Sequence, residues 1–181
     1  MTPCSPLLWA CRATTDDQTL VAVHAPLFAK ALQADVPAIQ LAAAKALGDM
    51  LTVFSKPVFE AAGEDADTGS VSFDSVVELL VEVAASSPDA QLKATIVEAL
   101  ARLMLLDRVE QQSVATLLLQ EYLMPAEVDL LTEAASEEAD QEELEAIAEQ
   151  LQAAARAQQC LAVFWSAYAV SSAEHQQMIL R

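Results

Sequence analysis

Few side chains in this sequence are of a type and spacing that could carry out chemistry. The three cysteines, Cys4, Cys11 and Cys160, contain no pair separated by two residues, so they indicate neither a thiol redox motif nor a disulfide framework. The two histidines, His24 and His175, stand alone in the sequence and lack the spacing of a helical zinc motif. We therefore predict no catalytic residue, no metal ligand and no cofactor-binding residue.

Motifs for nucleophilic attack or phosphate binding are also absent from the sequence. Cys160 falls in the apolar stripe of an expected helix, where a thiol acts as a small hydrophobic side chain. Gly48, Gly63 and Gly69 are isolated, so they form no phosphate-binding loop, and no serine occupies a Gly-x-Ser-x-Gly motif. The sequence thus predicts a protein that is not an enzyme, has no small-molecule substrate and acts by binding other proteins.

The composition favours an all-α protein in a reducing compartment. A length of 181 residues fits one domain, and a hydrophobic content of 54% with only three glycines favours helices. An odd number of cysteines indicates the cytosol or the nucleus. Because no apolar run approaches the roughly 20 residues that span a bilayer, we expect no membrane association.

Hydrophobic periodicity and capping residues predict a series of helices. The first, residues 18–32, is expected to follow cap residues at 14–17 and to kink or break at Pro26. Its apolar face is expected to contain Leu20, Val23 and Leu27. Further helices are expected at residues 37–54, where Pro57 ends the run, at 73–85, from Asp89 to near Asp107, at 110–124 and around 160–168.

Large apolar side chains on these helices should form the core. The ten that we expect to be buried are Leu41, Leu47, Leu80, Leu92, Ile96, Leu100, Leu103, Leu118, Leu161 and Phe164.

Two acidic segments, near residues 60–70 and 126–145, are predicted to be exposed loops. From Glu121 to Glu149 the sequence has eleven acids and no Lys or Arg. Such a run is typical of a solvated surface, because its like charges repel one another and the segment has little apolar area to bury. An alternative interpretation is that residues 133–149 contact a basic partner.

An internal similarity indicates repeated helix pairs. The segments Pro37–Leu41 and Pro88–Leu92 have related sequences, each opens a long helix, and they lie 51 residues apart. Without the acidic loop the interval is about 40 residues, which is in the range of HEAT and armadillo repeats. We therefore predict one domain over residues 1–181, built as an α-solenoid of HEAT/armadillo-like helix pairs.

The C-terminal part of the chain has the densest aromatic cluster and carries a family resemblance. It resembles the C-terminal domain of the condensin complex subunit 3 family, the G-type non-SMC HEAT subunits. The shared features are a Gln-Cys-Leu segment, a paired aromatic, a Tyr-Ala and a short polar break. They stand here as Gln159-Cys160-Leu161, Val163-Phe164-Trp165, Tyr168-Ala169 and Ser171-Ser172, with Gln176 beyond.

The similarity extends, in the same order, over residues 7–177. The further segments that resemble the family are 27–32, 46–51, 97–109 and 122–125. Three positions depart from the family pattern: Gln158 stands where Arg is usual, Trp165 replaces Phe, and Ser166 replaces a frequent Pro.

The resemblance implies that this chain is a segment of a longer HEAT-repeat solenoid. It implies a non-catalytic scaffold or regulatory subunit of condensin that binds the kleisin subunit and, through the complex, meets SMC ATPases and chromatin. The implied role is mitotic chromosome condensation, in the nucleus and on chromosomes, and in part in the cytoplasm. Two alternatives remain: a generic HEAT or armadillo protein–protein adaptor, and an acidic chaperone for histones or other basic partners.

Direct DNA binding by this chain is not expected. Its net charge is −18, and its nine Lys and Arg residues are spread over the whole length. A duplex contact needs several basic side chains on one surface, and the overall field repels phosphates.

Overall fold

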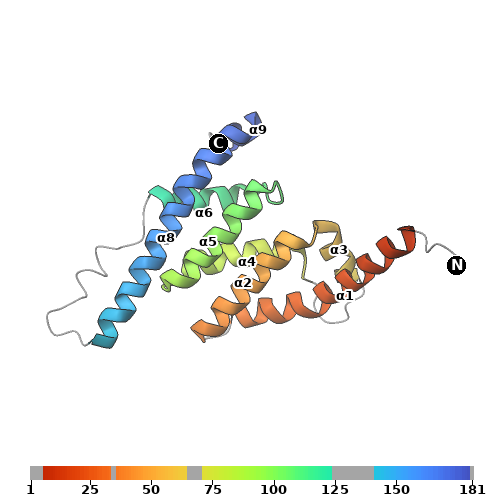
Figure 1. Ribbon diagram of the computed structural model, residues 1–181, viewed down its shortest axis with the longest axis horizontal. Helices are drawn as coiled ribbons and strands as arrows, with labels where there is room; N and C mark the ends of the chain where they lie inside the picture. Colours follow the sequence, from red (N-terminus) through yellow and green to blue (C-terminus); the bar gives the residue numbers. More distant parts are fainter. Residues whose placement is uncertain (1–5, 34–35, 65–70, 124–140, 180–181) are drawn as a thin grey trace. The chain divides into compact units, whose positions relative to one another are not determined.

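The computed structural model describes residues 6–33, 36–64, 71–123 and 141–179, and every regular element in these ranges is an α-helix (Figure 1). The all-α fold class predicted from the sequence is therefore confirmed. The helices pack in pairs, of which α1 with α2 and α5 with α8 are the most extensive. Packing divides the chain into two compact units, Met1–Leu79 and Leu80–Arg181, and the boundary falls inside α4.

The first unit contains α1 (Pro6–Leu32), α2 (Pro37–Val53), α3 (Lys56–Glu64) and the start of α4 (Phe73–Ser86). Helix α1 packs against both α2 and α3. The rings of Phe59 and Phe73 meet edge to face, with centroids 5.4 Å apart, and both are buried. Near them, Lys56 Nζ lies 2.6 Å from Asp74 Oδ2, so an ion pair links the start of α3 to the start of α4.

Helix α1 is longer than predicted, and a different face of the helix is buried. Residues 14–17 are helical rather than a cap, and the helix continues through Pro26 without a break. Leu20, Val23 and Leu27 are exposed, whereas Val21, Ala25 and Leu32, in the part of α1 whose side chains are described, are buried. Two stripes of this helix have helical spacing, and the stripe with the smaller side chains is the one that packs.

Helix α2 ends at Val53, before Pro57, in agreement with the predicted helix at residues 37–54. The helix α3 was not predicted, and Pro57 stands in its first turn, where the missing N–H removes no helical hydrogen bond. Residues 60–64 belong to α3 rather than to an acidic loop, and Ala62 is buried. Residues 65–70 lie outside the described residues.

The second unit contains the rest of α4 together with α5 (Ala90–Leu105), α6 (Gln112–Leu123), α8 (Gln141–Ser171) and α9 (Ala173–Ile179). Figure 1 shows α8 as a long helix, and α5 and α6 both pack against it. Residues 141–145 form the first turn of α8, which corrects their prediction as loop, whereas 124–140 lie outside the described residues.

Specific caps fix both ends of α5. Asp89 caps the start, since Oδ1 accepts hydrogen bonds from the backbone N–H groups of Gln91 (2.8 Å) and Leu92 (3.3 Å). At the end, the N–H of Arg108 bonds to the carbonyl of Leu103 and that of Asp107 to Met104, which is the Schellman pattern. Asp107 has φ of 54°, the left-handed conformation that this motif requires.

Most of the predicted core is confirmed. Of the ten side chains expected to be buried, nine are buried and Leu41 is half-buried. The buried face of α2 is formed by Ala43, Ala44, Leu47, Met50 and Leu51, and Leu41 lies at the edge of this face. Within the described residues, none of the helices has both the length and the apolar character that crossing a bilayer requires.

Candidate functional site

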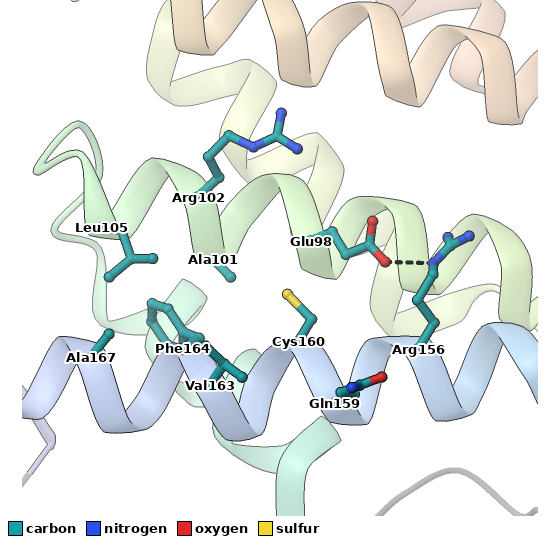
Figure 2. Close-up of a pocket in the computed structure, with 10 residues that line it drawn as sticks. All are labelled: Glu98, Ala101, Arg102, Leu105, Arg156, Gln159, Cys160, Val163, Phe164 and Ala167. Carbon is teal, nitrogen blue, oxygen red and sulfur yellow. Dashed lines mark hydrogen bonds and ion pairs between the residues drawn. The ribbon is translucent and has the colours of Figure 1, made fainter.

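A groove of about 520 Å³ runs between α5 and α8 in the second unit (Figure 2). Most of its walls are apolar, and its volume is in the usual range of protein binding sites. Helix α5 contributes Glu98, Ala101, Arg102 and Leu105, and helix α8 contributes Arg156, Gln159, Cys160, Val163, Phe164 and Ala167.

Helical periodicity places these side chains along the groove. On α5 the lining positions follow i, i+3, i+4, i+7, and α8 repeats the same spacing over three turns, so each set lies on one face of its helix. The small side chains of Ala101 and Ala167 leave the space open. Phe164 forms the floor, since its ring is only 2% exposed and stacks on Tyr168 at 5.2 Å.

An ion pair stands at one end of the groove. The Nε–H of Arg156 donates a hydrogen bond to Glu98 Oε1 at 2.6 Å and joins α8 to α5 (Figure 2). The side chain of Arg156 is 52% exposed, so solvent screens this pair and its contribution to stability is small. The pair therefore adds little to the stability of the contact between α5 and α8, and it places two charged groups at this end of the groove.

Cys160 lies inside the groove but is poorly suited to act as a nucleophile. Burial raises the pKa of its thiol, and the nearby Glu98 carboxylate raises it further, while Arg102 and Arg156 act in the opposite direction. The reactive thiolate is therefore scarce at neutral pH. That Cys160 acts only as a small apolar side chain stays a prediction.

A second polar cluster surrounds His175, which sequence reasoning treated as isolated. His175 Nε2 lies 2.8 Å from Asp107 Oδ1, and Nδ1 lies 2.6 Å from Ser171 Oγ. The imidazole stacks on the ring of Tyr168 at 4.0 Å, and Ser172 Oγ accepts the backbone N–H of His175 at 3.1 Å. The cluster thus fastens the break between α8 and α9 to the end of α5.

The presence of a serine, a histidine and an aspartate in line raises the question of hydrolysis. Ser171 Oγ also lies 2.8 Å from the carbonyl of Tyr168, to which its hydroxyl donates, so this hydroxyl is already engaged in the backbone. The α5/α8 groove is lined by none of the three residues. The arrangement is therefore that of a structural clasp, and the described residues also contain no group of three side chains placed to bind a metal ion.

Sequence reasoning found neither the groove nor the clasp. The groove joins residues that lie about sixty positions apart, such as Glu98 and Arg156, and no local motif announces such a pair. One feature of the sequence could have indicated the α8 side of the groove. Residues 150–170 contain no Asp or Glu, although the chain has 27 acidic residues. The clasp depends on Asp107, whose position past the end of α5 was predicted only approximately.

The architecture and the groove together indicate the class of protein. Paired helices, a shallow apolar groove and an engaged polar cluster are typical of helical-repeat modules that bind other proteins.

The comparison with protein families gives the particular family. A family model described as "Nuclear condensing complex subunits, C-term domain" matches residues 12–181. The chain therefore belongs to this family of condensin subunits, which confirms the assignment from the Gln-Cys-Leu helix and its neighbours. No curated protein and no solved structure matches the chain. Family membership makes it a condensin-subunit domain, and the family's description places it in the nucleus.

Proposed function

We propose that this chain is a non-catalytic scaffold of the condensin complex that binds the kleisin subunit and acts in mitotic chromosome condensation. The observation that carries the proposal is the family match over residues 12–181. Through the kleisin, the chain meets the SMC ATPases and chromatin, and ATP hydrolysis belongs to those partners.

The local chemistry supports a role in binding. The α5/α8 groove is an open and mostly apolar surface among the described residues of the second unit. A helical scaffold that holds partners needs a preformed surface with apolar area and few charges, since such a surface loses little entropy on binding. The groove meets this description, as Leu105 and Val163 are exposed on either side of it.

Affinity capture tests the proposal. The tagged chain is expressed in cells arrested in mitosis, and the captured proteins are quantified by mass spectrometry. We expect the condensin kleisin and both SMC subunits to be enriched over an untagged control. A Leu100→Asp variant is the matched control, because it buries a charge in the core between the helices and should unfold the second unit with little change in composition. Enrichment of other proteins without any condensin subunit would favour the adaptor alternative.

A further inference from the structure

We propose that the clasp around His175 depends on a proton: it is complete only when both ring nitrogens of His175 are protonated, and it loosens its hold on α9 as pH rises. The clasp consists of the contacts of His175 with Asp107, Ser171 and Tyr168. This inference goes beyond the proposed function, because it concerns the attachment of α9 within its own unit and not the identity of a partner.

Helix α9 is attached by side-chain contacts rather than by a hydrophobic core. None of its residues is buried. Besides the clasp, Gln176 Nε2 donates a hydrogen bond to the carbonyl of Ala169 at 2.8 Å, and the Tyr168 hydroxyl donates one to Met178 Sδ at 3.3 Å. Because α9 buries so little apolar area, the loss of a single hydrogen bond should change its attachment measurably.

The hydrogen bonds around His175 require two protons on its ring. Ser171 Oγ has a single proton, which it donates to the carbonyl oxygen of Tyr168 at 2.8 Å. The same oxygen can then only accept from His175 Nδ1, 2.6 Å away, so Nδ1 must be an N–H. The Asp107 carboxylate also only accepts, so His175 Nε2, at 2.8 Å, must be an N–H as well. A ring with both protons is the imidazolium cation.

A neutral His175 leaves this network one proton short. If Nε2 keeps its proton for Asp107, Nδ1 becomes an acceptor that faces Ser171 Oγ. The hydroxyl of Ser171 must then turn toward Nδ1 to supply a proton, and its hydrogen bond to the Tyr168 carbonyl is lost. The neutral clasp therefore makes one hydrogen bond fewer than the charged clasp.

The charged side chains near the ring are mostly acids. The titratable and charged groups in the turn after α5, in the last two turns of α8, in α9 and in α6 are Asp107, Arg108, Glu110, Tyr168, Glu174 and, at the far end of α6, Glu121 and Tyr122. Burial raises the pKa of the Tyr168 phenol, so this group stays neutral near pH 7. Apart from Arg108, every charged member of the set is an acid, and acids favour a cation on the ring.

Helix ends add to this preference. The C-terminal ends of α5 and α8 both lie at the clasp, since Asp107 follows α5 and Ser171 is the last residue of α8. A helix C-terminus carries partial negative charge and stabilises a nearby cation. His175 itself stands in the first turn of α9, whose positive end acts in the opposite direction, but α9 has only seven residues.

Low pH therefore favours the attached state of α9. Closing the clasp takes up a proton wherever His175 is neutral, so mass action couples the attachment of α9 to the proton concentration. The set of hydrogen bonds is complete below the ordinary range of histidine titration, about pH 6.5, and becomes incomplete as pH rises through that range.

A methyl NMR signal measures this attachment in the full chain. Met178 Sδ accepts the Tyr168 hydroxyl, so the methyl group on that sulfur reports whether α9 lies on α8, and a Met178→Leu variant assigns the signal. From about pH 5.5 to about pH 7.5, we expect the ratio of attached to detached α9 to fall about fivefold. His175→Gln cannot titrate, so its signal should stay constant. A wild-type signal as insensitive to pH as that of this variant would overturn the proposal.

The ring nitrogens of His175 give a second readout that keeps the histidine in place. Their ¹⁵N signals distinguish the imidazolium from the neutral ring. Asp107→Asn is the matched variant, because asparagine tolerates the left-handed backbone and keeps an oxygen acceptor but has no charge. We expect this variant to need about a threefold higher proton concentration than wild type for half-protonation of His175. If His175 titrates identically in the two proteins, the proposal is wrong, whatever the capture experiment shows about condensin.

Discussion

Asp107 has two roles, one through its backbone and one through its side chain. Its backbone adopts φ of 54°, which closes the Schellman motif after α5. Its Oδ1 atom lies 2.8 Å from Nε2 of His175. Glycine is the usual residue at such a position because it has no Cβ to clash. Aspartate enters the left-handed conformation more easily than most residues with a Cβ, and here its side chain also contacts His175.

Substitutions at Asp107 should separate these roles. We expect Asp107→Ala to lower the free energy of unfolding by about 1–3 kcal/mol, because it adds left-handed strain and removes a hydrogen bond. Asp107→Gly should fall between wild type and the alanine variant, since it removes the bond but relieves the strain. Urea denaturation of the three proteins measures both differences. An alanine variant as stable as the glycine variant would show that the backbone conformation carries no cost.

Tyr168 makes stability depend on pH in the alkaline range. Burial raises the pKa of its phenol above the ordinary value of 10.0, and the nearby Asp107 and Glu110 carboxylates add to the shift. The folded protein thus holds this proton more tightly than the unfolded chain, so the contribution to stability is present below pH 10 and is lost as pH rises through the folded-state pKa.

A conservative variant isolates this effect from the titration of lysines. Tyr168→Phe keeps the ring that stacks on Phe164 and His175 but removes the ionisable hydroxyl. Between pH 9 and pH 11, on the order of one unit on either side of an unshifted tyrosine, we expect wild type to lose more unfolding free energy than Tyr168→Phe. Parallel losses in the two proteins would mean that Tyr168 does not carry the pH dependence.

At the scale of the element, the contact between α5 and α8 organises the second unit. Phe164 is 2% exposed at this contact and touches both Trp165 and Tyr168. We expect Phe164→Ala to cost about 3–5 kcal/mol of unfolding free energy, because a buried ring is replaced by a cavity. Val170→Ala is the control on the same helix and should change little, since Val170 is 84% exposed. A loss below about 1 kcal/mol for Phe164→Ala would contradict the packing described here.

Elements with clear local signals were predicted well, and those without them were not. The predicted helix start at Asp89 agrees with α5, because capping is decided by the side chain of the cap residue itself. The start and the break predicted for helix α1 were wrong, because Thr and Asp are tolerated inside a helix and the helix continues through Pro26. The buried face of α1 could not be predicted from the sequence, because the packing of α2 and α3 decides which face of α1 is covered.

At the scale of the whole molecule, the family and fold class were predictable because many weak signals agree in order along the chain. The groove was not predictable, since it depends on the register with which α8 packs on α5. The same holds for the clasp, where Asp107 and His175 lie 68 positions apart. Long-range pairs of this kind leave no trace in local periodicity.

The charge distribution predicts that the isolated chain does not bind duplex DNA. The net charge is −18, and Lys56, Lys93 and Arg156 are each engaged by an acid in the structure. Counterion release, the main source of duplex affinity, needs several basic side chains on one surface. Fluorescence anisotropy with a labelled duplex at about 150 mM salt should show no binding at micromolar protein. Micromolar or tighter binding that weakens steeply with salt would overturn this prediction.

The central claim is that the chain is a binding module for the condensin kleisin, and a titration of the two purified proteins tests it most directly. Isothermal titration calorimetry of the full chain into the full-length kleisin, without DNA or SMC subunits, should show saturable binding with a dissociation constant of about 10 µM or tighter. A Leu100→Asp chain, whose second unit should be unfolded, gives the baseline. No heat above that baseline at concentrations around 100 µM would contradict the account.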